Sequence, residues 1–499
     1  MKYIAAFITI AFVATLAPAP AAGPAADTVV ISQGVDADTL DPIRSTPTTT
    51  ENVTSQIFDR LVFPDASGKH RPMLALRWKR TAPKIWEYHL RPGVTFSNGD
   101  PFTSEDVKFT YDKLRDPGYK SAQAPYADSI DRIEAPSPNV VRFITKVPIA
   151  YPAFRPELIR IVDAKYWKAH GDAYMAEHPI GTGAYVLRAW HKDEEVILDA
   201  RPDYWGGKPA IAHAIFRPIP ENAARVAALR TGEIDLATNL PAQNVEQIAR
   251  GAGTDFASAP SLRFIFIAFD QLSPGPLQNK LVRQAINYAV DVPAIIKSIL
   301  RGYGHPIASP INPGFTGYDP HAASYRHDPA KVKELLAKAG YAKGFPFTIN
   351  TPRGRYANDY EVAQAIAGQL SAAGIPTSVK TEEWTVYQKE LNAKQLGPAY
   401  LLGWSNNTYD ADATVTPLLY STSNRAYWKN EKFDQLVDAA RAELDPKKRA
   451  ALYAQLVALT HDEAPWIFLY QMEDLYGKSK RLHWQPRSDE VLRVFDMSL

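Results

Sequence analysis

The chain has 499 residues, and its 56 lysines and arginines nearly balance its 54 aspartates and glutamates. No basic stripe or polybasic cluster marks a nucleic-acid or lipid surface, so neither partner is expected. The sequence contains no cysteine, which excludes a disulfide framework and a cysteine nucleophile. At this length, two or three domains held by hydrophobic cores are expected.

The N-terminus has the features of a secretory signal peptide. Lys2 precedes an apolar run from Tyr3 to Leu16, and Ala19-Pro20-Ala21 fits a small-residue cleavage site. The run is shorter than the roughly 20 apolar residues of a membrane-spanning helix, which makes an anchor the weaker alternative. We therefore predict a cleaved signal peptide over residues 1–21 and a periplasmic protein. Because no cysteine follows it to carry a lipid, a lipoprotein is not expected.

The first half of the mature chain predicts mainly strands and turns. An apolar strand is expected at Thr28–Ser32, and a helix from about Thr48 to Leu61. The segment Trp86–Leu114 combines an alternating strand, turn residues and a helix that Thr103 or Ser104 can cap. The residues expected on the buried face of that helix are Val107, Tyr111 and Leu114.

From Phe264 onward, helices with clear start signals alternate with short strands. The apolar run Phe264–Phe269 predicts a buried strand. Asp328-Pro329 and Asp445-Pro446 each place a capping aspartate before a proline in the first helical turn. A further helix is expected over Asp359–Gly374. This alternation indicates an α/β fold.

Six short segments carry motifs that occur together in one protein family. They are Thr39–Pro42, Ile57–Leu61, Trp86–Leu114, Pro179–Tyr185, Ala228–Asp235 and Val282–Asp291. In this order, behind a signal peptide, they resemble the bacterial extracellular solute-binding proteins of family 5. This family contains the dipeptide-, oligopeptide- and nickel-binding receptors of ABC importers.

The resemblance implies a mixed α/β, periplasmic binding protein-like fold with two lobes, a hinge and an extra subdomain in the first lobe (cluster C type). Mapped onto this chain, lobe 1 would span residues 22–269 with 476–499, and its extra subdomain about 67–172. Lobe 2 would span residues 270–475. Family members enclose the ligand between the lobes by hinge closure.

The implied function is that of a solute-binding receptor. It would capture a small peptide-like, opine-like or glycosyl-phosphate-like solute and deliver it to the membrane permease subunits of an ABC importer. We expect a monomer that performs no catalysis.

The segment Leu402–Asp412 resembles the ligand loop of this family, G-W-x-x-D-x-x-D-P-D. In peptide-binding members the first aspartate of the motif pairs with the α-ammonium of the peptide, and here Asn407 occupies its position. An amide supplies no opposite charge, and a buried ammonium without a carboxylate is costly. The substitution therefore favours a neutral or anionic ligand. Asp410 and Asp412 match later acids of the motif, which can serve as turn caps instead.

Two arginines lie where family members often place an arginine near the carboxylate of the ligand. Arg353 and Arg355 suit a carboxylate, phosphate or sugar acid because the guanidinium is a planar, bidentate fork. Solvated loop arginines are the alternative. The full set of candidate ligand-binding residues is Thr48, Thr49, Arg353, Arg355, Tyr356, Trp404, Asn406, Asn407, Tyr409 and Asp410.

The other candidates also have structural alternatives. Trp404 and Tyr409 can stack on a sugar or peptide face, or pack in the core. Thr48 and Thr49 belong to a polar segment that lines the first-lobe side of the ligand site in the family, but either hydroxyl can instead cap a helix.

No catalytic or metal-binding motif is visible, so neither catalytic residues nor a cofactor is expected. The histidines lack H-x-x-x-H spacing, and no G-x-S-x-G or S-x-x-K nucleophile occurs. One alternative is a receptor for a metal or haem chelate, which would need His305 and the arginines near the ligand. Another is a secreted non-cysteine hydrolase on the same scaffold.

Overall fold

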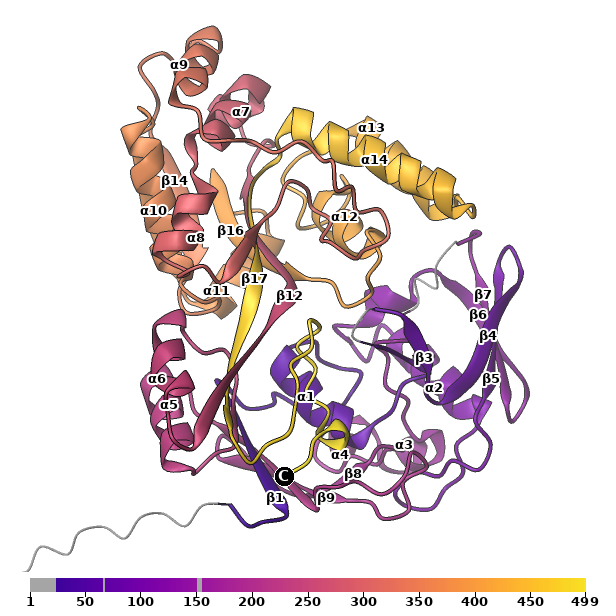
Figure 1. The fold of residues 1–499 in the computed structure, drawn as a ribbon. Helices are drawn as coiled ribbons and strands as arrows, with labels where there is room; N and C mark the ends of the chain where they lie inside the picture. Colours follow the sequence, from indigo (N-terminus) through magenta and orange to yellow (C-terminus); the bar gives the residue numbers. More distant parts are fainter. Residues whose placement is uncertain (1–23, 66–67, 150–154) are drawn as a thin grey trace, which may run out of the picture.

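The computed structural model describes residues 24–65, 68–149 and 155–499, and the predicted signal peptide lies outside them. In this part of the chain the largest sheet has eleven strands, with helices packed on it (Figure 1). The mixed α/β class predicted from the sequence is confirmed. Within the described ranges, none of the helices has the length and apolar character needed to cross a bilayer.

Two long antiparallel strands, β12 (Thr254–Phe269) and β17 (Trp466–Ser479), run through the middle of the molecule (Figure 1). Buried apolar side chains form separate cores at the two ends of this pair. We call the described residues up to 260 and from 473 onward lobe 1, and residues 261–472 lobe 2. The domain boundaries expected after residues 269 and 475 fall at the end of β12 and inside β17, and they stay predictions.

Lobe 1 contains one end of the large sheet, in the order β17-β11-β1-β10-β9-β8. These strands are β1 (Thr28–Gln33), β8 (Tyr185–His191), β9 (Glu195–Ala200), β10 (His213–Pro218) and β11 (Leu236–Ala237). The helices of the lobe are α1 (Thr48–Ile57), α2 (Ser104–Leu114), α3 (Ala164–His170), α4 (Asp172–Met175), α5 (Asn222–Thr231) and α6 (Val245–Ala249).

Two smaller sheets complete lobe 1. A hairpin pairs β2 (Val62–Pro64) with β3 (His70–Pro72). A four-stranded sheet has the order β4-β5-β7-β6 and lies within the range expected for the extra subdomain. Its strands are β4 (Ala75–Ala82), β5 (Ile85–Leu90), β6 (Ile130–Ser137) and β7 (Val140–Thr145).

The segment Trp86–Leu114 folds as the sequence predicts, into β5, a turn and α2. The backbone N–H of Thr103 donates to the Asp106 carboxylate at 2.8 Å, which closes a capping box at the start of the helix. The three residues expected on the buried face of α2 are all fully buried. This segment therefore supplies one strand of the four-stranded sheet of lobe 1 and a helix that contacts two of its other strands, β6 and β7.

Helix α1 is shorter than expected, because it ends at Ile57 and not near Leu61. The backbone N–H of Gly183 donates to the Ile57 carbonyl at 2.8 Å, and a Cβ at Gly181 would lie 2.0 Å from that oxygen. The Pro179–Tyr185 segment thus crosses the end of the helix so closely that another turn has no room. The glycines of this motif are needed because a side chain at either position would clash with the backbone of α1.

Lobe 2 contains the other end of the large sheet, in the order β15-β14-β16-β12-β17, with β13 also paired to β17. The remaining strands are β13 (Gly304–Pro306), β14 (Phe347–Pro352), β15 (Thr377–Glu382) and β16 (Ala399–Ser405). The helices are α7 (Lys280–Ala289), α8 (Val292–Ser298), α9 (Pro329–Lys338), α10 (Asp359–Ala372), α11 (Trp384–Asn392), α12 (Asp412–Leu419), α13 (Glu431–Ala442) and α14 (Pro446–Glu463).

The apolar run at the end of β12 is buried on both faces. Ile265, Ile267 and Phe269 join the core that includes α7 to α10. Their neighbours, Phe264 and Phe266, join the core that includes α12 to α14, on the other side of the sheet (Figure 1). A central strand covered by helices on both faces explains why this run is apolar throughout.

Candidate functional site

The expected ligand loop connects the end of β16 to α12 in lobe 2. Trp404 lies opposite Phe264 of β12, and its indole Nε1–H donates to the Ala413 carbonyl at 3.1 Å. The indole is half-buried, so one part of the ring is held by the loop and another part faces solvent.

Two candidates in this loop use their polar groups to hold its shape. Asn406 donates to the Asp410 carbonyl at 2.7 Å and to Thr414 Oγ1 at 2.9 Å, and its own oxygen accepts the Thr408 N–H at 3.0 Å. Asp410 forms a buried, bidentate pair with Arg449, with one contact at 2.9 Å. Both side chains are nearly inaccessible, at 3% and 2% exposure. Their bonds support the loop and leave little capacity for a ligand.

Asn407, which replaces the acid of the peptide-binding motif, is half-buried. Its Oδ1 accepts a hydrogen bond from Ser405 Oγ at 3.0 Å. In the part of the chain that the structure describes, Nδ2 has no hydrogen-bond acceptor. The residue can therefore donate to an anionic or neutral oxygen.

Tyr409 and Asp412 face lobe 1. A Cβ at Gly68 would lie 2.4 Å from Cδ1 of Tyr409, so the tyrosine ring rests directly on that glycine. Burial raises the pKa of the Asp412 carboxyl, but the positive charges of Arg441 in lobe 2 and of Arg155 in lobe 1 have the larger combined effect. The pKa of Asp412 therefore lies below its usual value. Lobe 2 therefore meets lobe 1 through the same loop that carries the candidates.

The two sequence-predicted arginines lie on the loop between β14 and α10. The carboxylate of Asp359 accepts the backbone N–H groups of Gly354, Arg355 and Tyr356 at 2.9 to 3.0 Å and so fixes the loop. The Arg355 guanidinium lies 5.1 Å from the ring centroids of Tyr356 and Trp384, and that of Arg353 lies 4.9 Å from Tyr360. Both arginines are exposed. Among the described residues, neither has an ion-pair partner.

Tyr356 joins the arginine loop to the ligand loop. Its hydroxyl donates to the Gly403 carbonyl at 3.2 Å, next to Trp404. A Cβ at Gly403 would lie 2.6 Å from Cε1 of Tyr356, so glycine is needed for this approach. The ring is buried, and the Arg355 guanidinium stacks on it.

Arg425, on the connection between α12 and α13, was not among the sequence candidates. Its guanidinium carbon lies 5.3 Å from the centroid of Trp404, and its Nε is 3.4 Å from Asn392 Oδ1. Burial lowers its pKa, and the groups that act on it electrostatically are Tyr126, Tyr400 and Tyr356. No described carboxylate lies within 4.0 Å of it.

On the side of lobe 1, Thr48 and Thr49 occupy the first turn of α1 and are half-buried. Pro47 is the N-cap residue, and no side chain caps this helix end, so the capping alternative is not observed. A cavity of about 420 Å³ lies next to this turn. Its lining residues are Asp38, Thr39, Arg44, Ser45, Thr46, Pro47, Ala122 and Ala176.

The lobes are also joined where the β12–β17 strand pair passes from one lobe to the other. The register of β12 against β17 shifts between Pro260 and Phe264. There the Ser488 carbonyl accepts the Leu262 N–H at 2.8 Å, and Glu490 forms an ion pair with Arg263 at 3.2 Å. The C-terminal loop of lobe 1 is thus bonded to β12 where this strand passes between the lobes, which is the natural position of a hinge.

The profile of a known family matches this chain. It is described as "Bacterial extracellular solute-binding proteins, family 5 Middle" and matches residues 69–426. The chain belongs to this family. The resemblance inferred from the six motifs is therefore confirmed, and so is the function of a solute-binding receptor of ABC importers.

Family relatives with different ligands align over most of the chain. Heme-binding protein A of Haemophilus influenzae is 30% identical over 84% of this chain and 82% of its own length. Glutathione-binding protein GsiB of Escherichia coli O157:H7 is 28% identical over 92% of this chain and 91% of its own length.

Solved structures agree in fold over nearly the whole chain. The periplasmic binding protein DppA of Helicobacter pylori, in complex with the peptide STSA, has a TM-score of 0.83 and 28% identity, over 95% of this chain and 98% of that chain. AgaA of A. tumefaciens R10, in complex with agropinic acid, has a TM-score of 0.80 and 26% identity, over 94% and 96%. The family scaffold is thus shared by receptors for peptides and for opine-type acids.

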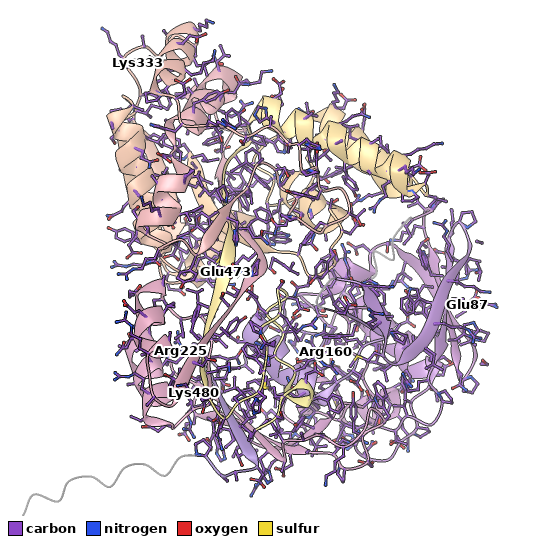
Figure 2. The ribbon with its side chains drawn as sticks, viewed as in Figure 1. Glu87, Arg160, Arg225, Lys333, Glu473 and Lys480 are labelled. Atoms are coloured by element: carbon purple, nitrogen blue, oxygen red, sulfur yellow. The ribbon has the colours of Figure 1, made fainter. Side chains whose placement is uncertain are left out.

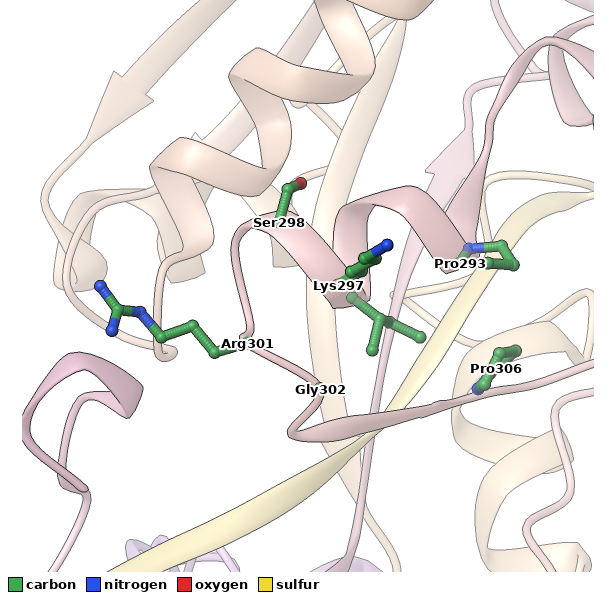
Figure 3. Close-up of a pocket in the computed structure, with 7 residues that line it drawn as sticks. Pro293, Lys297, Ser298, Arg301, Gly302 and Pro306 are labelled. Atoms are coloured by element: carbon green, nitrogen blue, oxygen red, sulfur yellow. The ribbon is translucent and has the colours of Figure 1, made fainter. Parts of the chain in front are cut away.

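A further cavity is lined by none of the candidate residues. It measures about 720 Å³ and lies on lobe 2 beside α8, where Figure 3 shows Arg301 extending away from Lys297. Its lining residues are Pro293, Ile296, Lys297, Ser298, Arg301, Gly302 and Pro306. It is open to solvent and belongs to one lobe, so a solute bound there would make no contact that draws the lobes together.

Proposed function

We propose that this receptor binds an anionic solute between its lobes, in the periplasm, and passes it unchanged to a permease. The solute would be peptide-like, opine-like or glycosyl-phosphate-like. The observation that carries the proposal is the pair of exposed arginines, Arg353 and Arg355, which have no described ion-pair partner and lie beside the ligand loop.

The surroundings of Arg355 suit a carboxylate or phosphate. Its guanidinium is stacked on Tyr356 and Trp384, which orients the fork while leaving its N–H groups available. Asn407 supplies an amide donor where the peptide-binding motif has an acid. Together they present donors and positive charge, with no aspartate at that position to hold an ammonium group.

Ligand binding would then be linked to closure. Tyr409 and Asp412 of the ligand loop already face lobe 1, so a solute held by this loop lies close to both lobes. A solute that contacts both lobes favours the closed form by its differential affinity for that form. The register shift in β12 gives the strand pair a place to bend.

A thermal-shift panel tests the ligand class. A solute present at 100 times its Kd should stabilise the receptor by about 2.7 kcal/mol. We expect opine acids, sugar phosphates or acidic peptides to shift the Tm more than dipeptides without net charge, such as the zwitterion Ala-Ala. Replacing Arg355 with glutamine should remove most of that shift. A strong shift with Ala-Ala and none with the acids would contradict the proposal.

A second candidate is a receptor for a haem or metal chelate, which the 30% identical relative named Heme-binding protein A favours. His305, which that alternative would need, pairs with Glu473 at 3.0 Å on the β13–β17 strand pair (Figure 2 labels Glu473). Within the described residues, no cluster of three histidine, aspartate or glutamate side chains is placed to hold a metal ion. Titration with haemin, followed by its absorption spectrum, would separate this candidate from the first.

The proposed receptor also has an expected maturation and oligomeric state. We expect cleavage after Ala21, no lipid anchor, and a monomer without enzymatic activity. The N-terminal sequence and intact mass of the exported protein would check the first two points. Light scattering on the purified receptor, and recovery of unmodified ligand from it, would check the others.

A further inference from the structure

We propose that Arg425 forms a second anion subsite, separate from Arg353 and Arg355, and that the physiological solute therefore carries two acidic groups. This inference rests on the proposed function, because it concerns the same solute bound between the lobes. To the proposed function it adds two points: the solute carries two acidic groups, and Arg425, which lies outside the family motifs, binds one of them.

Arg425 differs from the other half-buried or buried arginines of lobe 2. Each of the others pairs with a carboxylate at 2.5 to 3.2 Å. These pairs are Arg263–Glu490, Arg283–Glu463, Arg441–Asp412 and Arg449–Asp410. Arg425 has only a 3.4 Å contact to an amide oxygen and the face of Trp404. A partly desolvated guanidinium without a counter-charge is unfavourable unless a ligand supplies one.

The position of the guanidinium is fixed by its neighbours. Trp404, under it, is held by its own hydrogen bond to Ala413 and by the pairing of β16 with β12. Ala426 and Tyr427, which follow Arg425, are buried, so the backbone of this connection is packed into lobe 2. The Tyr400 hydroxyl also donates to the Arg425 carbonyl at 2.9 Å. The charge is therefore oriented before any solute arrives.

The two subsites share one tyrosine as a neighbour. Arg355 stacks on Tyr356 at 5.1 Å, and the charge of Arg425 also acts on Tyr356. Tyr356 in turn bonds to Gly403, the residue before Trp404. A small solute that spans this tyrosine could place one acidic group on each guanidinium.

Tyr126 is the residue of lobe 1 that we assign to the second subsite. It lies within electrostatic range of Arg425, and burial, followed by the nearby Glu51, raises the pKa of its phenol. The phenol is thus neutral and keeps its proton, and its hydroxyl donates to no described residue. An anion bound to Arg425 could accept a hydrogen bond from the Tyr126 hydroxyl across the interface between the lobes. This contact would exist only when the lobes are together, so it would favour closure.

The experiment uses pairs of probes that differ by one carboxylate. Ala-Glu and Ala-Gln form one pair, and a glutamate-derived opine acid and its glutamine counterpart form another. Calorimetric titration of the full-length mature receptor should give tighter binding of the diacid by about tenfold or more, the size expected for one charge-assisted hydrogen bond.

Variants assign that preference to one side chain. Arg425→Gln should abolish the preference, so that both members of a pair bind alike, whereas Arg355→Gln should weaken both members. Arg326→Gln removes the same charge from an exposed position on lobe 2 and should leave both affinities unchanged. Tyr126→Phe, which keeps the ring, should reduce diacid binding several-fold and leave the monoacid unaffected. It keeps the test informative if the Arg425 variant is poorly folded.

The outcomes separate the two proposals. Equal loss for both members of a pair in Arg425→Gln would mean that Arg425 only positions Trp404, and would overturn this inference while the proposed function stands. A wild-type receptor that binds the diacid and the monoacid equally would also overturn it. Failure of every acidic probe to bind the wild type would contradict the proposed function, and this inference with it.

Discussion

The base of the ligand loop and the arginine rim beside it, formed by Arg355 and Arg425, both contain charged and polar side chains. Those at the base have partners within the protein, and those at the rim have no carboxylate partner in the part of the chain that the structure describes. At the base, Asn406 and Asp410 are buried, and the Asp410 carboxylate is paired with Arg449. At the rim, Arg355 is exposed and Arg425 is half-buried, and neither has a carboxylate partner among the described residues. Polar groups with partners hold the loop in shape, and those without partners are available to a solute.

The largest expected effect comes from breaking the pair at the base. Asp410→Asn leaves the Arg449 guanidinium buried without its counter-charge, so we expect the free energy of unfolding to fall by about 3 kcal/mol or more. Arg425→Gln removes a charge that has no partner, and we expect a change of about 1 kcal/mol or less. Urea denaturation of both variants measures the contrast. Equal losses would contradict the distinction between base and rim.

The next effect concerns pH and a second paired acid, in lobe 1. Burial raises the pKa of Asp59 to about 6, even though Trp205, Thr182 and Tyr204 donate hydrogen bonds to it. Between pH 4 and about 6 the unfolded chain has lost this proton while the folded protein keeps it. Folding stability should therefore fall as the pH rises through this window, by about 3 kcal/mol in total for a shift of about two pKa units.

Asp59→Asn tests that contribution. The variant starts from lower stability because asparagine accepts fewer hydrogen bonds, but its loss of stability between pH 4 and 6 should be smaller than in the wild type. Asp41 keeps its own contribution in both proteins, since its pKa is also raised to about 6, mainly by burial. Unfolding free energies at several pH values give the two slopes. Identical slopes would show that Asp59 is ionised in the folded protein throughout this range.

The long-range role of Asp59 marks the limit of what the sequence could predict. The order of motifs gave the family, and Asp328 and Asp445 were recognised as helix caps that do accept backbone N–H groups. The contact from Asp59 to Thr182 joins two motifs that are 123 residues apart, which no local pattern reveals. The early end of α1 has the same cause, because Gly181 and Gly183 occupy the space that a further turn would need.

The residues of the candidate site also divide into those that the sequence could identify and those that only the packing of distant segments reveals. Arg355 could be proposed because it lies where family members often place an arginine near the carboxylate of the ligand, and Trp404 because it belongs to the ligand loop. Arg425 and Tyr126 lie in connections without a motif, and packing brings them to the interface from separate segments. The length of β12 was also missed, because Pro260 and Ser261 interrupt its apolar pattern where the strand passes between the lobes.

A contact at the interface between the lobes should affect affinity more than stability. Gly68 has a φ of 79° and carries the ring of Tyr409, so Gly68→Ala would push the lobes apart. We expect a loss of affinity of about tenfold that is the same for every solute, because the fraction of closed receptor falls. Calorimetry with two unrelated ligands measures it.

Gly93→Ala is the matched control for this variant. Gly93 has a nearly identical φ of 76°, but no atom lies within 4 Å of the position of its missing Cβ. The control should lose a similar amount of stability from backbone strain and keep its affinity. A parallel loss of affinity in both variants would mean that strain in lobe 1, and not the contact with Tyr409, controls binding.

The smallest expected effect separates the two arginines that the sequence could not rank. Arg353 stacks on Tyr360 of α10, whereas Arg355 stacks on Tyr356 and Trp384, and Tyr356 is bonded to the ligand loop. Arg353→Gln should therefore weaken binding of an acidic solute by less than about threefold, through loss of long-range attraction that salt screens. Arg355→Gln should weaken it by about tenfold or more at any salt concentration, because it removes a direct hydrogen-bonding partner. Titrations at low and high salt distinguish the two modes, and a large, salt-independent loss in Arg353→Gln would place the first anion subsite on the α10 side of the loop.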